Sequence, residues 1–73
     1  MLETSERAEQ AATDVLAKSS VRELRALRVD GTSTQLRLTG RVSSFYHKQL
    51  AQEAVRPVTQ GRQIINSVSV CPK

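Results

Sequence analysis

The residues best suited to chemistry in this 73-residue sequence are three arginines, Arg28, Arg37 and Arg41. Each lies in a segment where apolar and polar residues alternate, so on β-strands all three would point away from the neighbouring leucines and valines. A guanidinium group can donate two parallel hydrogen bonds to a phosphate or carboxylate. The spacing therefore predicts a basic surface for an anionic ligand. Alternatively, these arginines only keep an uncovered sheet soluble and prevent edge pairing.

A second candidate contact surface begins at Phe45. Phe45 and Tyr46 stand close to Lys48, and aromatic rings beside a cation are typical of segments that settle at a membrane interface or contact a partner. Alternatively, one ring closes the core and the other caps it. Ile65 is expected on the same face as the arginines, where an apolar side chain indicates that a partner or a second subunit covers part of that face.

Catalytic and metal-binding patterns are missing from the sequence. His47 has no partner at the spacing of a known catalytic motif, and Cys71 is the only thiol, so no disulfide can form within the chain. A Cys/His metal site would need more ligands than these two residues supply. We therefore expect no cofactor, no bound metal and no enzymatic activity.

Charge is distributed unevenly along the chain, whose net charge is +4. Residues 1–20 carry a balance of −2, and residues 21–73 carry a balance of +6. A basic body favours phosphate groups, lipid headgroups or acidic proteins as partners, although it can also serve solubility alone. Nucleic acid is a less favoured alternative because Phe45 and Tyr46 are the only rings available to stack on bases, and the glycines form no Gly-x-x-Gly loop.

Two helices are indicated by apolar residues at helical spacing. The first stripe contains Ala8, Ala11, Ala12, Val15 and Leu16, and the second contains Leu50, Ala51, Ala54, Val55 and Val58. Ser43 or Ser44 can cap the second helix. Pro57 bars regular helix beyond about Arg56.

Three segments alternate with a period of two and predict strands: residues 24–30, 35–42 and 64–70. The first two are joined by a short loop containing Gly31, which predicts an antiparallel hairpin. Gly40 interrupts the second, where we expect a helix to press on the sheet. The last two flank a helix, and such a crossover makes strands parallel. The sequence thus predicts an α+β fold in the order α-β-β-α-β, with two helices packed on one face of a three-stranded mixed sheet.

A single domain is expected over residues 1–73, with a core at about residues 10–70. No segment approaches the roughly 20 apolar residues needed to span a bilayer, and the acidic start does not read as a secretory signal. As given, the chain is expected in the cytoplasm. It would be periplasmic or membrane-associated if it were a fragment of a longer exported protein. The oligomeric state is left open.

Residues 37–55 resemble the centre of a BON domain. The resemblance rests on a strand with the pattern apolar-x-Gly-x-Val at Leu38, Gly40 and Val42, and on helix alanines at Ala51 and Ala54. The closing strand is similar to the family's V-x-N-x-V-x-V pattern, with matching residues at Ile64, Asn66, Val68 and Val70. The family's Gly-Val pair before that strand is replaced by Gly61-Arg62-Gln63-Ile64, which leaves the strand register open.

This resemblance implies a small module of bacterial outer-membrane-associated, periplasmic and osmotic-stress proteins. It implies binding to phospholipid surfaces or protein partners and implies no catalysis. No binding residues of the family carry over individually.

Overall fold

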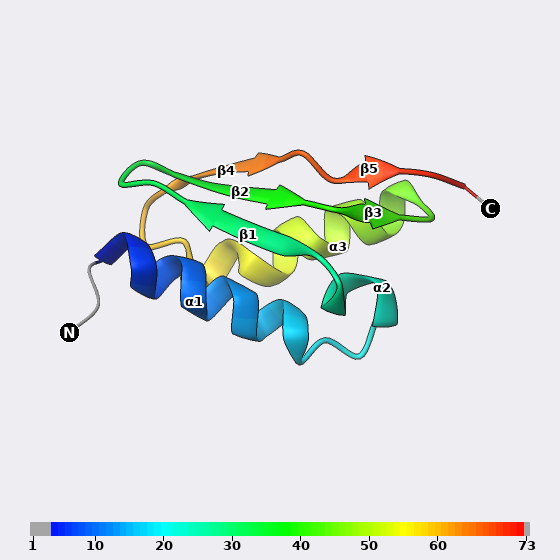
Figure 1. Ribbon diagram of the computed structural model, residues 1–73, viewed down its shortest axis with the longest axis horizontal. Helices are drawn as coiled ribbons and strands as arrows, with labels where there is room; N and C mark the ends of the chain where they lie inside the picture. Colours follow the sequence, from blue (N-terminus) through cyan, green and yellow to red (C-terminus); the bar gives the residue numbers. More distant parts are fainter. Residues whose placement is uncertain (1–3, 73) are drawn as a thin grey trace.

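The computed structural model describes residues 4–72, and Figure 1 shows its strands as one layer above two long helices. The elements follow the order α1 (Thr4–Ala17), α2 (Arg22–Arg25), β1 (Arg28–Gly31), β2 (Gln35–Thr39), β3 (Arg41–Val42), α3 (Phe45–Val55), the 3₁₀ turn η1 (Arg56–Val58), β4 (Gln63–Asn66) and β5 (Ser69–Val70). The α+β class predicted from the sequence is confirmed.

The main sheet contains β1, β2 and β4, with β2 in the centre. β1 and β2 are antiparallel and place Val29 opposite Leu38, as expected for the predicted hairpin. β2 and β4 are parallel and place Leu36 beside Ile64. The sheet is therefore mixed, because the long connection through α3 returns the chain in the same direction whereas the short hairpin reverses it.

The core lies between one face of this sheet and both helices (Figure 1). The buried helix residues are Ala8, Ala12 and Leu16 on α1, and Ala51 and Val55 on α3. The buried strand residues sit at alternate positions and are Val29, Leu36, Leu38, Val42 and Val68, the last of these in the segment between β4 and β5. Because each helix has one apolar stripe, both pack on the same side of the sheet and leave its other face to solvent.

The second and third predicted strands are each divided in two. β2 ends at Thr39 and β4 at Asn66, and β3 and β5 then form a second parallel pair with Arg41 beside Ser69. Leu38 pairs with Asn66, so both chains advance three residues between the two ladders. No residue is inserted on either side. The register that the sequence left open is therefore constant through the break.

Gly40 sits where the central strand breaks. Its φ is +131°, a conformation that residues with a Cβ rarely adopt. A Cβ at this position would lie 2.7 Å from Cδ2 of Leu27, a buried side chain in the segment between α2 and β1. The sequence predicts a helix pressing on Gly40, but the close neighbour is this leucine instead.

Helix α2 replaces the start of a predicted strand. The alternation over residues 24–30 predicts extended backbone, whereas Arg22–Arg25 form a helical turn and β1 begins only at Arg28. The N–H of Leu24 donates to the carbonyl of Val21 at 3.1 Å, and the Leu24 side chain is buried. Leu24 and Leu27 are three residues apart, a spacing that places both on one face of a helical turn but on opposite faces of a strand, and both are buried. The alternation that indicates a strand therefore begins only at Leu27.

Asn66 ties β4 to α3. Its Nδ2 donates to the carbonyl of Lys48 at 3.0 Å and to Oε1 of Gln52 at 3.2 Å. Its Oδ1 accepts the N–H of Val68 at 3.2 Å. The preceding N–H, that of Ser67, donates to the central strand at 2.9 Å. The Asn66 side chain thus satisfies backbone groups on both the helix and the strand break, as a polar side chain on an inward-facing position requires.

We predict that Gly40→Ala destabilises the fold more than Gly61→Ala. Both glycines have positive φ, at +131° and +83°, so both variants carry backbone strain of about 1–3 kcal/mol. A Cβ at Gly61 would meet nothing within 4 Å, whereas one at Gly40 would also collide with Leu27. Urea unfolding measures the difference, and equal midpoints for the two variants would contradict the close packing at Gly40.

We also predict that Asn66→Ala lowers the free energy of unfolding by about 1–3 kcal/mol, because it removes the acceptor of the Val68 N–H and the donor to the Gln52 side chain. Ser67→Ala is the matched control, since Ser67 is exposed on the adjacent position. Thermal unfolding followed by circular dichroism provides the comparison. A variant at Asn66 as stable as the Ser67 control would show that these hydrogen bonds contribute little.

Candidate functional site

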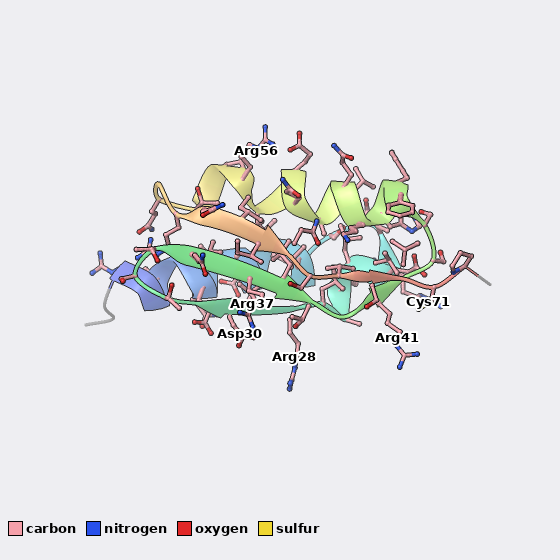
Figure 2. The ribbon with its side chains drawn as sticks, turned by 90° about the horizontal axis from the view of Figure 1, so that it is seen from above. Arg28, Asp30, Arg37, Arg41, Arg56 and Cys71 are labelled. Carbon is pink, nitrogen blue, oxygen red and sulfur yellow. The ribbon has the colours of Figure 1, made fainter. Side chains whose placement is uncertain are left out.

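The sheet face opposite the helices carries the three arginines that the sequence singles out. We call it the open face and define it by the outward positions of the strands: Arg28, Asp30, Arg37, Thr39, Arg41, Ile65 and Ser69. All three arginines are exposed. In Figure 2, which looks down on the sheet, Arg28 and Arg41 extend past the same edge of the molecule, whereas Arg56 extends past the opposite edge. The structure therefore brings the three arginines onto one surface.

Arg37 occupies the middle of the open face, where its neighbours are an acidic and an apolar residue. Asp30 lies directly opposite it on β1, and Ile65 lies beside it on β4; Figure 2 shows Arg37 and Asp30 close together. Opposite charges on facing strand positions attract each other. The carboxylate of Asp30 therefore offsets part of the positive potential of Arg37. Ile65 is half-buried and adds an apolar patch next to this pair.

Arg28 and Arg41 have neutral neighbours instead. Arg28 faces Thr39 across the hairpin, and Arg41 pairs with Ser69 across the second ladder. Their charges are therefore not offset by a facing carboxylate on the paired strand. Sequence alternation alone treats the three arginines as equivalent, but the register makes Arg28 and Arg41 the stronger sources of positive potential.

A shallow pocket of about 200 Å³ lies at the hairpin end of the open face. Asp30, Thr32, Gln35 and Arg37 line it. Its charged lining contains one acid and one base, so it has no strong preference for anions.

Phe45 and Tyr46 are both exposed, with 75 % and 69 % of their surfaces accessible. The alternative in which one ring closes the core and the other caps it is therefore wrong. Ala51 and Val55 define the buried stripe of α3, and one turn earlier this stripe passes through the half-buried His47 and Lys48. The two rings fall outside the stripe, and the Lys48 side chain is less exposed than either.

The helix begins at Phe45 because Ser44 caps it. Ser44 has extended backbone, with φ at −149°, and its side chain accepts the N–H of His47 at 3.2 Å. Of the two predicted caps, Ser44 performs this role. The cap places both rings in the first turn of α3, directly after the end of β3.

Glu23 joins three segments at this end of the molecule. Its Oε1 accepts hydrogen bonds from the N–H of Ser43 at 3.1 Å and from the Ser43 hydroxyl at 2.9 Å. The same oxygen contacts Nδ1 of His47, and both side chains are about one quarter exposed, at 28 % and 27 %. Because the hydrogen bond from the Ser43 backbone N–H stabilises the charged carboxylate, the pKa of Glu23 is lowered.

Sequence reasoning missed this cluster. Glu23 lies on α2, which was not predicted, and its partners are about twenty residues away along the chain. The local pattern contains no signal that would pair them.

The cluster is not arranged for nucleophilic catalysis. Such chemistry needs a hydroxyl hydrogen-bonded to an imidazole that removes its proton. Here the hydroxyl of Ser43 and Nδ1 of His47 both contact the Glu23 carboxylate, so this hydroxyl donates to the acid.

Cys71 is exposed after β5. Residues 4–72 contain no cluster of three or more side chains able to hold a metal ion, and none of their helices combines the length and apolarity needed to cross a membrane.

Comparison with known families identifies a match along nearly the whole chain. The family model of the BON domain matches residues 4–72. The match confirms the resemblance drawn from the strand pattern around Gly40 and the helix alanines. No curated protein matches the chain.

We predict that Glu23→Gln destabilises the fold at neutral pH and that the difference disappears in acid. A carboxyl whose pKa is lower in the folded protein stabilises it above the unfolded pKa, near 4.5, and loses this contribution as pH falls through the folded pKa. Urea unfolding of both proteins between pH 7 and pH 3 provides the measurement.

Glu53→Gln is the control for this experiment. Glu53 forms an exposed ion pair with Arg56 at 2.9 Å, and such pairs contribute little. If the Glu23 and Glu53 variants showed the same small loss of stability at pH 7, the contacts of Glu23 with Ser43 and His47 would not be stabilising the fold.

Proposed function

Since the chain belongs to the BON domain family, whose domains are in general non-catalytic binding modules, we propose that it binds anionic phospholipid surfaces through the open face. The observation that carries this proposal is the set of three exposed arginines on a sheet face that neither helix covers. An uncovered face of a small sheet needs polar side chains, but it does not need them to be mostly of one sign.

The physical basis is attraction between guanidinium groups and lipid phosphates. A basic residue near an anionic membrane contributes about 1 kcal/mol, and a planar guanidinium can donate two hydrogen bonds to one phosphate. Arg28 and Arg41 supply this attraction without a facing carboxylate. Asp30 lies opposite Arg37 and reduces the attraction that Arg37 contributes. The binding is therefore expected to depend strongly on salt.

The apolar part of the open face supports contact with a surface of limited polarity. Ile65 is half-buried beside Arg37 and would lose its remaining contact with water on docking. Nucleic acid remains the alternative ligand of a basic face, and it is tested in the same experiment.

We predict that Arg28→Glu/Arg41→Glu lowers the affinity for anionic vesicles at least about tenfold. Arg7→Glu/Arg56→Glu is the matched control, because it changes the net charge equally at two exposed positions outside the open face. Arg37→Glu should reduce affinity less than either Arg28→Glu or Arg41→Glu, since Asp30 already offsets its charge. Vesicle sedimentation with phosphatidylglycerol and with phosphatidylcholine measures these effects.

Three results would count against the proposal. One is the absence of binding to phosphatidylglycerol vesicles. Another is an equal loss of vesicle affinity for the Arg28/Arg41 variant and the Arg7/Arg56 control. That result would mean that binding depends on net charge and not on a particular surface. The third is saturable binding to a single-stranded oligonucleotide combined with no response to vesicles, which would assign the open face to nucleic acid.

A further inference from the structure

One end of the molecule combines exposed aromatic rings with a concentration of basic residues. The fold is elongated, measuring 41 × 20 × 16 Å along its principal axes. At the end where β3 leads into α3, Figure 1 shows α2 next to these two elements. We call this end the α3 tip and define it as residues 22–25 and 41–48. The hairpin between β1 and β2 lies at the opposite end (Figure 1).

The aromatic part of the α3 tip is unusual for a solvent-facing surface. Phe45 and Tyr46 are the large hydrophobic residues that stand exposed among the described residues, and they are adjacent in the chain. Neither ring contributes to the stripe that attaches α3 to the core. Their exposure therefore has no explanation in the packing of the fold, and it is confined to a single site.

The charged part of the α3 tip is strongly basic. Arg22, Arg25, Arg41 and Lys48 are the basic residues of this region, and Glu23 is the acidic one. The Glu23 carboxylate is already bonded to Ser43 and contacts His47, so it is directed into the fold and not toward a ligand. No acidic residue lies in the first turn of α3. The two exposed rings thus lie at the same end of the molecule as these four basic residues, although the Arg25 side chain donates to the Ser19 carbonyl at 2.7 Å.

We infer that Phe45 and Tyr46 insert between the headgroups of an anionic bilayer and orient the protein on it. This inference rests on the proposed function and adds a second, apolar contact to it. Aromatic side chains settle at the boundary between headgroups and acyl chains, while basic side chains at the same end of the molecule stay at the level of the phosphates. Arg41 belongs to both surfaces, so the bilayer meets the molecule along the edge that joins the open face and the α3 tip.

Charge complementarity favours a bilayer over a second copy of the chain as the occupant. Two α3 tips facing each other would bring like charges together, and such contacts oppose association. An anionic lipid surface satisfies both the rings and the cations at once. Self-association is nevertheless a measurable outcome of the experiment below.

The absence of tryptophan from the chain allows a direct test. Phe45→Trp places a single fluorescent ring at the α3 tip, and Ser33→Trp places one in the hairpin at the opposite end. With phosphatidylglycerol vesicles, the emission of Phe45→Trp should shift to shorter wavelength and be quenched by brominated acyl chains. The emission of Ser33→Trp should stay unchanged. Phosphatidylcholine vesicles should leave both variants unaffected.

A second measurement isolates the contribution of the rings to affinity. Phe45→Ala/Tyr46→Ala should lower the vesicle partition coefficient by about tenfold or more, because it removes two apolar side chains that become buried on docking. Both positions lie outside the core, so the melting temperature should not change. Phe45→Leu/Tyr46→Phe, which keeps apolar bulk, should retain most of the binding.

The outcomes separate this inference from the proposed function. Binding of Phe45→Trp to phosphatidylglycerol vesicles without a spectral shift would overturn the inference and leave open-face binding intact. Failure of every variant to bind would overturn both. A shift that grows with protein concentration in the absence of vesicles would also overturn the inference, because it would show that a second copy of the chain covers the rings.

Discussion

The structure depends on a hydrophobic core that lies on only one face of its sheet. Both helices bury their apolar stripes on the same face of a single sheet, and the strands bury every second residue against them. Burial of these side chains supplies the main driving force for folding a chain of this size. The same packing forces the intervening strand residues outward. The arginines of the open face are therefore exposed as a direct consequence of the positions that Leu36 and Leu38 must occupy.

A second constraint acts where the sheet meets the start of α3. Gly40 allows Leu27 to approach the central strand, and the Glu23 carboxylate joins α2 to Ser43 and His47 a few residues later. These contacts position the first turn of α3 relative to β3. They bring α2 against the start of α3, so that the basic residues of α2 and the two exposed rings lie at the same end of the molecule, although α2 and α3 are well separated in the sequence. The same contacts thus position both the charged and the apolar residues of the α3 tip.

The two candidate surfaces use different physical effects. In the proposed function, the open face would act through long-range attraction, which salt weakens and which a facing carboxylate such as Asp30 reduces. The α3 tip would act through apolar contact, which is short-ranged and little affected by salt. A module that carries both can be attracted to an anionic surface by charge and then be held in one orientation by its rings. Arg41, which lies where the two surfaces meet, links these effects.

Much of the fold could be predicted from the sequence because it follows from local periodicity. The spacing of apolar residues in α1 and α3, the turn around Gly31 and the alternation in the strands depend only on near neighbours in the chain. The helix–strand order then restricts the possible sheet topologies. Predictions failed where a segment was too short to show a full period, as at residues 22–27, where a single helical turn precedes β1.

Residue periodicity and composition were enough to predict the fold class, the family and the three outward-facing arginines. The folded structure was needed to establish which arginine faces Asp30, which partner Glu23 binds and whether Phe45 and Tyr46 are buried. Those properties depend on contacts between residues that are distant in the chain, and on the exact rotation of α3 over the sheet. Local patterns carry no information about either, because packing of the whole molecule sets them.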